Sequence, residues 1–380
     1  MTARSANAEQ PTARRPRHEH TILVLQGGGS LGAYQAGAYE GLAEAGMVPD
    51  WITGVSIGAI NAALIAGNPP ARRVERLRTF WDRVSAGVPL ELPAILDPLR
   101  LAFNRVSAFG AAAFGINGFF SPRVPPPYLA TDGTAGALSF YDTEPLRRTL
   151  TELVDFRLIN DHSTRLSVGA VNVRTGDSVY FDNRHHHLTT EHIRASAALP
   201  PGFPPITIGG DQYWDGGIVS NSPLWYVLDD SPRLNALIIQ VDLFSAKGEL
   251  PINLNQVLER AKDIQYSSKT RFNTKRVKEL KQLHDVLGRL LEKLPPELRD
   301  SPDGRELHAL CDQGNVTLAH LINRRLAYSA QSKDYDFSRT TVNELWAAGL
   351  EDVRQGVARF DLLKPTDAEF GMRVYDLTRK

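Results

Sequence analysis

Residues 51–67 read WITGVSIGAINAALIAG, and this stretch decides the fold that the sequence predicts. A short run rich in β-branched residues ends at Ser56, with Gly54 and Gly58 two residues away on either side. An unbroken Ala/Ile/Leu stretch then continues to Gly67. The pattern predicts a strand, a sharp turn that exposes the serine hydroxyl, and a helix whose free N–H groups would stabilise an oxyanion beside Ser56. The same five residues also suit a tight turn without chemistry.

A second glycine-rich segment precedes this one. Residues 21–26, TILVLQ, have the length and composition of a strand, and Gly27-Gly28-Gly29-Ser30-Leu31-Gly32 follows directly. An Ala-rich stretch then runs to Gly46, which predicts a helix and completes a parallel βαβ unit. The loop also matches the dinucleotide-binding pattern, which requires an acidic residue at the end of the second strand. Here Asp50 lies before that strand, so nucleotide binding is disfavoured.

The glycine loop and the serine turn end neighbouring parallel strands, so they should meet at one edge of the sheet. Main-chain N–H groups of Gly27, Gly28 and Gly29 could then bind the negative charge that develops when Ser56 attacks a carbonyl carbon. Acyl transfer is the reaction class that needs a nucleophile and an oxyanion hole together. A third site, Asp215-Gly216-Gly217, lies between an aromatic strand end and a helix start at Ser222-Pro223. Alone, it would indicate an ordinary Asx turn.

Composition excludes several functions. The chain has 380 residues with 42% hydrophobic residues, and its 43 Lys and Arg balance 43 Asp and Glu. Without a net field, we expect neither nucleic-acid binding nor general attraction to acidic membranes. Cys311 is the single cysteine, which fits a reducing, cytoplasmic compartment. Residues 1–20 are polar and Arg-rich without an apolar segment, so we expect a disordered tail rather than a signal peptide.

Several further segments have testable interpretations. Residues 106–120, VSAFGAAAFGINGFF, are apolar and uncharged, which suits either the border of an acyl site that contacts lipid interfaces, or plain core. Residues 166–182 predict a hairpin. The triplet His185-His186-His187 cannot converge on one ion in a regular strand or helix, and no metal or other cofactor is expected.

The composition changes after residue 245, which predicts a mainly helical extension over 246–380 following a core over 21–245. Residues 254–294 predict a long helix with one leucine stripe, formed by Leu280, Leu283, Leu287, Leu290, Leu291 and Leu294. Its first half is basic, through Lys269, Arg271, Lys275, Arg276, Lys278 and Lys281. Such residues can face a membrane, but the solvated side of a packed helix is the favoured interpretation. Residues 316–322 predict a strand and residues 340–360 a last helix.

Taken together, GGGSLG at 27–32, GVSIG at 54–58 and DGG at 215–217 resemble the motifs of the patatin-like phospholipase family. The string ASAALPPGFPP at 195–205 is similar to that family as well, and the resemblance covers roughly residues 20–245. It implies a three-layer α/β/α fold with a mostly parallel sheet and a lipid acyl hydrolase with a Ser/Asp dyad. Residue by residue, Ser56 would be the nucleophile, Asp215 the base, and the Gly27 to Gly29 backbone the oxyanion hole. Gly32 is assigned to the same oxyanion and substrate-binding site. The substrate would be a lipid or other acyl ester, with peripheral membrane contact.

One loop position departs from the family, since many relatives carry Arg or Lys where this chain has Leu31. Without that positive charge, a neutral ester, a thioester or a polyester becomes a more plausible substrate relative to a phospholipid. The competing enzyme class is the Ser-His-Asp α/β-hydrolase, for which His284, His308 and His320 follow Asp215 in the required order. An inactive lipid-binding or scaffold protein is the non-enzyme alternative. The sequence carries no signal for an oligomeric state.

Overall fold

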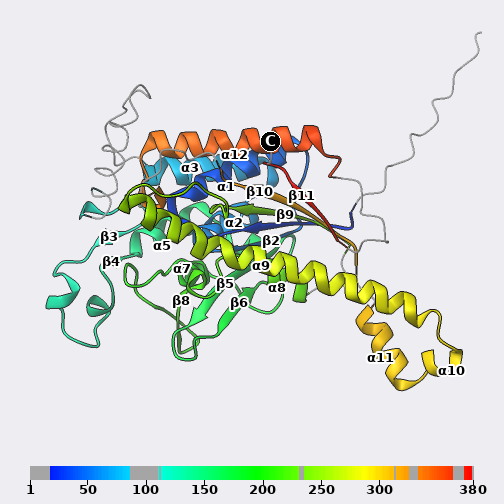
Figure 1. Cartoon of the computed structure of the whole chain (residues 1–380). Coiled ribbons are helices and arrows are strands. Elements are labelled where there is room, and N and C mark those ends of the chain that lie inside the picture. The colour runs from blue at the N-terminus through cyan, green and yellow to red at the C-terminus, as the bar shows by residue number, and fades with distance from the viewer. Residues whose placement is uncertain are drawn as a thin grey trace, which may run out of the picture.

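A nine-stranded sheet organises the part of the chain that the computed structural model describes, which is residues 18–85, 110, 113–230, 235–311, 314–324, 333–362 and 372–378. The strand order is β11-β10-β9-β1-β2-β5-β8-β7, with β6 also pairing with β5 (Figure 1). The strands are β1 His20–Leu25, β2 Trp51–Val55, β5 Arg165–Asn172, β6 Ser178–Asp182, β7 Ile206–Ile208, β8 Asp211–Asp215, β9 Ala236–Asp242, β10 Val316–Ile322 and β11 Met372–Asp376. From β11 to β5 all neighbours are parallel, whereas β6, β7 and β8 are antiparallel additions. The predicted mostly parallel sheet and the β5–β6 hairpin are confirmed.

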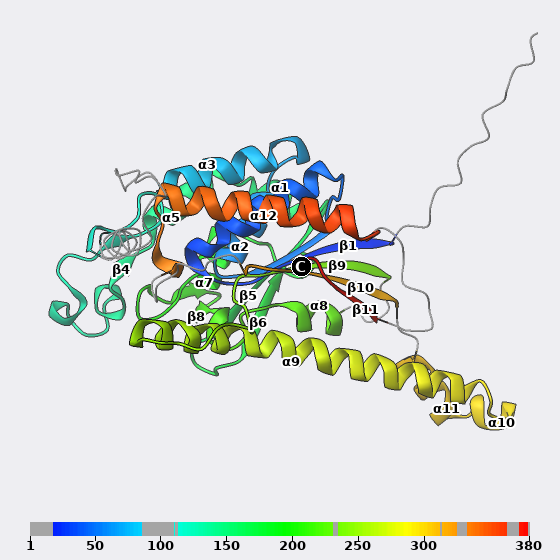
Figure 2. The ribbon, with the colours of Figure 1, turned by 45° about the horizontal axis from the view of Figure 1, so that its top comes forward.

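Helices cover both faces of this sheet (Figures 1 and 2). One face carries α1 Gly32–Glu44, α2 Ile57–Ala66, α3 Arg73–Ser85 and α12 Arg339–Arg359; the other carries α8 Leu224–Asp230 and α9 Leu254–Leu291. Strand β1 is apolar throughout because both of its faces are buried. Leu23 and Leu25 belong to the larger core, while Ile22 and Val24 belong to the smaller core with α8. A strand buried on both faces cannot alternate with polar residues. The predicted three-layer α/β/α architecture is confirmed.

Residues beyond 245 are built into the same sheet. Strand β10 pairs with β9, and β11 extends the edge, so the predicted strand over 316–322 is confirmed and a further strand, β11, was missed. The predicted last helix is α12, which packs along α1. A Cβ on Gly37 would lie 1.9 Å from Trp346 O, and one on Gly349 would lie 2.0 Å from Tyr34 O, so glycines let the two backbones touch. The domain boundary near 245 stays a prediction, with the sheet continuing across it.

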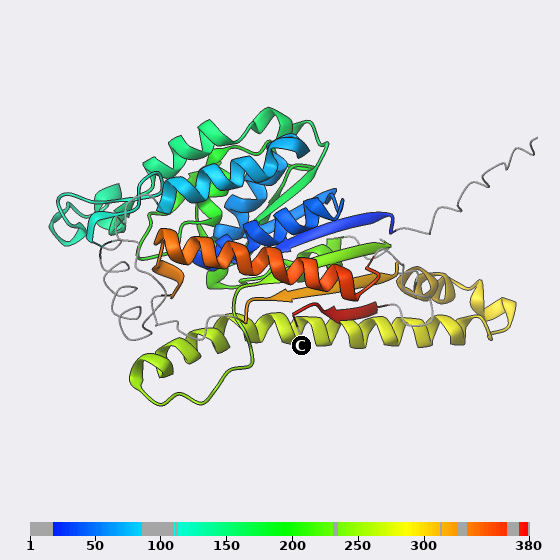
Figure 3. The same cartoon turned by 90° about the horizontal axis from the view of Figure 1, so that it is seen from above.

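The long helix α9 differs from its predicted pattern in two respects. Lys281 is buried and donates to Gly314 O at 2.7 Å, and burial lowers its pKa to about 8. Leu283 and Leu290 of the leucine stripe are instead more than half exposed, whereas Leu291 is buried. Figure 3 shows the physical reason, because the later part of α9 projects past the sheet and is accompanied there by α10 Pro296–Arg299 and α11 Pro302–Cys311. In the part of the chain that the structure describes, no helix combines the length and apolarity needed to cross a membrane.

The remaining helices are α5 Glu144–Leu153, α6 Phe156–Asn160 and α7 Thr190–Ser196, and a two-stranded ribbon pairs β3 Ser121–Pro122 with β4 Tyr141–Asp142. The predicted tail lies outside the described residues as far as position 17. Within the apolar run 106–120, residues 106–109 and 111–112 also lie outside them.

Candidate active site

Ser56 occupies the turn between β2 and α2 in a backbone conformation that few side chains adopt. Its φ is 58° and its ψ is −127°. The turn is tight because a Cβ on Gly54 would lie 2.3 Å from Gly58 O, and one on Gly58 would lie 2.4 Å from Leu25 O. Such strain persists only where surrounding structure enforces it, and it is typical of functional sites. The predicted strand, sharp turn and helix are therefore present.

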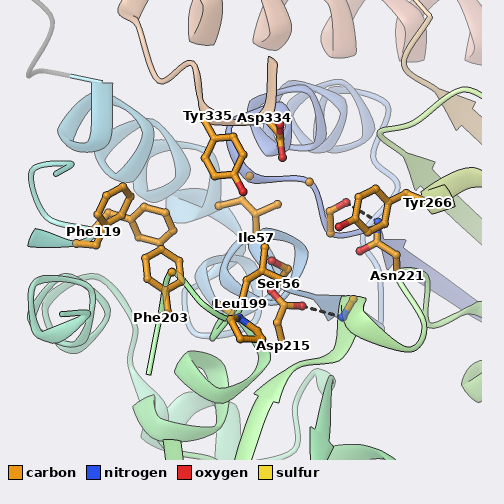
Figure 4. A pocket seen from close by; sticks show the side chains of 18 of the residues that line it. Ser56, Ile57, Phe119, Leu199, Phe203, Asp215, Asn221, Tyr266, Asp334 and Tyr335 are labelled. Atoms are coloured by element: carbon orange, nitrogen blue, oxygen red, sulfur yellow. Dashed lines mark hydrogen bonds between the residues drawn. The ribbon is translucent and has the colours of Figure 1, made fainter. Parts of the chain in front are cut away.

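Sheet register brings Asp215 to Ser56 from more than 150 positions away in the sequence. Val55 pairs with Gly169 on β5, and the next β5 residue, Ala170, pairs with Asp215 at the end of β8. The two side chains lie next to each other in Figure 4. A Cβ on Gly216 would lie 2.7 Å from Gly169 O, which explains the glycine after the aspartate. The structure thus brings together the serine and the aspartate that the sequence singled out.

Asp215 is a buried carboxylate with one oxygen free of hydrogen bonds. The main-chain N–H of Gly217 donates to Oδ1 at 2.8 Å, whereas Oδ2 has no hydrogen-bond partner within the described chain. Burial raises the pKa of Asp215 to about 7, and the nearby Ser56 side chain and the Gly217 N–H oppose this shift only in part. A carboxyl group that titrates near neutrality, beside a hydroxyl, has the properties of a general base.

The glycine loop contributes main-chain donors, but its three glycines differ. Gly27 donates to Asn221 O at 3.2 Å and accepts from Asn221 Nδ2 at 2.9 Å, so its N–H is already engaged. For the N–H groups of Gly28 and Gly29, the described residues provide no acceptor. Gly29 has φ 57°, and a Cβ there would lie 2.2 Å from Asp334 O. Gly32 begins α1 and packs closely against Ile57, where a Cβ would lie 2.5 Å from Ile57 Cγ1.

These groups face a cavity of about 340 Å³ with a mainly aromatic and aliphatic wall (Figure 4). The wall is formed by Gly27, Gly28, Gly29, Ser56, Ile57, Phe119, Phe120, Tyr141, Ala197, Leu199, Pro200, Pro201, Gly202, Phe203, Asp215, Gly217, Asn221, Phe244, Tyr266, Asp334, Tyr335 and Phe337. Phe119 and Phe120 therefore border the site, as the sequence predicts for this run. Both are buried, whereas Phe114 is 84% exposed and Phe109 lies outside the described residues.

Four cavity residues come from beyond position 245 and were missed by the sequence analysis: Tyr266 of α9, and Asp334, Tyr335 and Phe337. Asp334 and Tyr335 belong to a short 3₁₀ turn, η6 Lys333–Tyr335, which lies over the glycine loop. Their local sequence, KDYDF, carries no motif that marks a binding site. The extension thus forms one wall of the same cavity.

Charge inside the cavity is sparse. Asp215 and Asp334 are the charged residues among the described lining residues. Lys262 Nζ lies 2.6 Å from both carboxylate oxygens of Asp334, so this second carboxylate is balanced by a cation from α9. Leu31, the loop position at which the sequence departs from the pattern that it resembles, is fully buried and does not line the cavity. The described wall therefore offers no side-chain cation of its own to a phosphate group.

All ten histidines lie in the described residues, and none of them lines the cavity. His320 is half-buried on β10 beside Gln240, with Nε2 3.1 Å from Gln240 Oε1, and desolvation of its ring lowers its pKa to about 4. His284 and His308 are on α9 and α11. Around His185, His186 and His187, as elsewhere in the described chain, no group of three or more metal-ligating side chains comes together.

A short segment at the end of α7 links the serine turn to the aspartate. The N–H of Ser56 donates to Ser196, and the N–H of Asp215 donates to Ala198 O at 3.0 Å. Ser196 Oγ in turn donates to Gly169 O at 2.6 Å. In the sequence this segment is recognisable only as part of the string 195–205, because nothing in its residue types indicates which backbone groups it holds.

Known proteins of one family are similar to this chain. A family model described as patatin-like phospholipase matches residues 23–228, and one described as patatin phospholipase matches residues 264–369. Lysophospholipase NTE1 of Meyerozyma guilliermondii is 26% identical over 247 residues, which are 65% of this chain and 14% of that protein. Patatin-like phospholipase domain-containing protein 7 of Mus musculus is 34% identical over 209 residues, which are 53% of this chain and 12% of that protein. The chain thus matches only about a seventh of the length of these relatives.

Among solved structures, VipD from Legionella pneumophila is 14% identical with a TM-score of 0.34, and the match covers 90% of this chain and 70% of VipD. ExoU from Pseudomonas aeruginosa, solved with SpcU, is 18% identical with a TM-score of 0.26, covering 92% of this chain and 80% of the other. At these scores neither structure adds to the argument.

Proposed function

This chain belongs to the patatin-like phospholipase family, and we propose that it is a lipid acyl hydrolase that cleaves carboxylic esters with Ser56 and Asp215. One observation carries the proposal. A serine in a strained turn lies beside a buried carboxylate whose pKa is raised to about 7, and both face an apolar cavity. The expected biological role is lipid degradation, as the names of its relatives suggest.

The proposed reaction uses groups that are already in place. Asp215 Oδ2 accepts the proton of the Ser56 hydroxyl while Oγ attacks the ester carbonyl carbon. The carbonyl oxygen becomes an oxyanion, and the N–H groups of Gly28 and Gly29 are its proposed donors, because the N–H of Gly27 is engaged by Asn221. Collapse of this intermediate breaks the ester bond, and Asp215 returns the proton to the leaving alcohol. Water then attacks the acyl-serine, Asp215 takes its proton, and the free acid leaves as Ser56 regains a hydrogen.

An uncharged acyl ester or thioester is a second candidate substrate class beside a phospholipid. The described cavity wall contains no Arg or Lys, and Asp334 is balanced by Lys262. A phosphate group inside this cavity would lose hydration without gaining a cationic partner, which is unfavourable. A phospholipid substrate would therefore have to keep its head group outside the cavity.

Labelling with a fluorophosphonate ester probe tests the proposal. We expect the native chain to be labelled and the Ser56→Ala variant to remain unlabelled while retaining its circular dichroism spectrum. Removal of a hydrolytic nucleophile should lower turnover of a butyrate ester by about a thousandfold or more. A folded Ser56→Ala protein with near-native esterase activity would refute the proposal. A native chain that neither reacts nor turns over esters would support the inactive lipid-binding alternative.

A further inference from the structure

Six large apolar side chains are strongly exposed on two segments of the structure. Their exposed fractions range from 71% to 91%. The first segment, between β3 and β4, carries Val124, Tyr128 and Leu129; the second, at the start of α9, carries Leu250, Ile252 and Leu254. We call these six the rim residues. Single exposed apolar residues are ordinary, but groups of this kind indicate an interaction surface.

Both segments lie at the end of the molecule toward which the parallel strands run. In Figures 2 and 3 the turquoise segment before β4 and the yellow-green start of α9 occupy this end, and α10 and α11 occupy the opposite end. The cavity lies at the same edge of the sheet, because β1 and β2 end directly before Gly27 and Ser56. Tyr141 of β4 and Phe244, which precedes the second segment, belong to the cavity wall. Both segments that carry the rim residues are therefore close in sequence to residues of the cavity wall.

The charges of these segments indicate which surface they fit. Residues 121–140 contain one cation and one anion, Arg123 and Asp132, and residues 247–258 contain Lys247 and Glu249. Each segment is thus formally neutral, so attraction to anionic head groups would contribute little. The exposed tyrosine fits a boundary between apolar and aqueous phases, where its ring and hydroxyl are both satisfied.

The arrangement of the rim residues also favours a lipid surface over a second protein as their binding partner. A stable protein interface needs roughly 800 Å² of continuous, complementary surface on each partner. The rim residues instead lie on two segments that are far apart in sequence, and much of each segment has irregular backbone. A deformable lipid surface can accept side chains from both segments at once.

We propose that the rim residues insert into the surface of a neutral or zwitterionic lipid aggregate and hold the sheet edge that carries the cavity against it. This inference rests on the proposed function for its purpose, since it presents aggregated esters to Ser56. It adds two later segments to the lipid contact that the sequence predicts for 106–120, a prediction that partly lies outside the described residues. Phe119 and Phe120 line the cavity and are buried, and Phe114 of the same run is 84% exposed, whereas the six rim residues belong to later segments.

Co-sedimentation of the full chain with phosphatidylcholine vesicles tests this proposal. The rim variant Leu129→Glu/Ile252→Glu should bind the vesicles at least tenfold more weakly than the native chain. A matched control is Leu298→Glu/Leu310→Glu, because those leucines are 57% and 55% exposed on α10 and α11 at the opposite end. This control should bind within twofold of the native chain. Raising the salt concentration to 0.5 M should leave native binding unchanged, since screening weakens only charge-based attachment.

The proposed lipid-binding surface would be refuted by a rim variant that binds the vesicles as tightly as the native chain. Native binding that requires phosphatidylserine in the vesicles would also refute it. Turnover of a water-soluble butyrate ester separates this proposal from the proposed function, because the rim residues do not line the cavity. Vesicle binding without any ester turnover would support the lipid-binding surface and refute the hydrolase activity. Ester turnover without vesicle binding would support the hydrolase activity and refute the lipid-binding surface.

Discussion

The main-chain N–H of Ser56 donates to both the carbonyl oxygen and Oγ of Ser196, each at 3.1 Å. Ser196 Oγ also donates to Gly169 O at 2.6 Å on the strand that separates the serine turn from Asp215. The buried Ser196 side chain thus fixes the position of the serine turn relative to β5. We infer that Ser196 is a positioning residue for Ser56, with no contact to substrate.

Ser196→Ala should lower kcat for a butyrate ester by about tenfold and leave KM within twofold, because the turn loses one of its two anchors. Unfolding should also become easier by about 1–3 kcal/mol, the usual cost of losing a buried hydrogen bond. Ser85→Ala is the matched control, since Ser85 is equally buried and its Oγ donates to Trp81 O at 2.7 Å. That variant should lose similar stability at unchanged kcat. Equal kcat in both variants would remove the positioning role.

Asp215→Asn should reduce turnover by roughly a hundredfold to ten-thousandfold, the range of general-base contributions. An aspartate at its ordinary pKa of about 4 would give no step near neutral pH. Burial instead raises the pKa of Asp215 to about 7, so kcat/KM of the native chain should fall as the pH is lowered through 7. Release of butyrate measured between pH 5 and 9 checks this. A profile that stays flat down to pH 5 would contradict the assignment of Asp215 as the base.

Single alanine replacements of His284, His308 and His320 should leave turnover within about threefold of native, because none of these side chains lines the cavity. His320→Ala carries the greatest risk to folding, since it removes a hydrogen-bond partner of the buried Gln240 side chain. His320→Gln therefore provides a second variant, with unfolding curves recorded for both. Loss of activity as complete as in Ser56→Ala, in a folded histidine variant, would establish a Ser-His-Asp triad instead.

Asp215→Asn should also stabilise the fold at pH 8 and not at pH 4. The folded-state pKa of Asp215 is near 7, above the value of 3.8 for an unperturbed aspartate. Between these two values a rising pH removes the proton from the unfolded chain first, so the native protein loses stability across this window. Asparagine cannot ionise and avoids the loss, which is on the order of 1–4 kcal/mol. Denaturant unfolding of the native and Asp215→Asn proteins at pH 4 and 8 measures this loss. An equal difference in their free energies of unfolding at both pH values would contradict the raised pKa of Asp215.

Phe119→Ser/Phe120→Ser should shift chain-length preference. Both rings lie in the cavity wall, and each buried methylene of a bound chain is worth about 0.8 kcal/mol. We expect kcat/KM for a laurate ester to fall by about tenfold or more and that for a butyrate ester by less than threefold. Vesicle binding should not change, because both side chains are buried. Equal losses for both chain lengths would mean that these rings serve only the core.

Several features followed from local sequence because they depend on contacts between near neighbours. The turn at Ser56 needs Gly54 and Gly58, whose backbones touch across five residues, and the glycine loop follows directly from the end of β1. The continuous apolar run at residues 21–26 indicated the strand that became β1, and the structure buries that strand on both faces of the sheet. These patterns predicted the parallel βαβ unit and the elements at which Ser56 and Asp215 lie.

What only the tertiary structure decided depends on residues far apart in sequence. The register of β5 with both β2 and β8 brings Asp215 to Ser56, and no property of either segment encodes that register. Burial then moves the pKa of Asp215 to about 7, because the cost of removing its charge from water depends on everything packed around it. The same holds for Gly27, whose N–H is taken by Asn221, and for Tyr335 and Phe337, which reach the cavity only because α12 packs along α1. Sequence determined which residues could do the chemistry, and packing decided which of them meet.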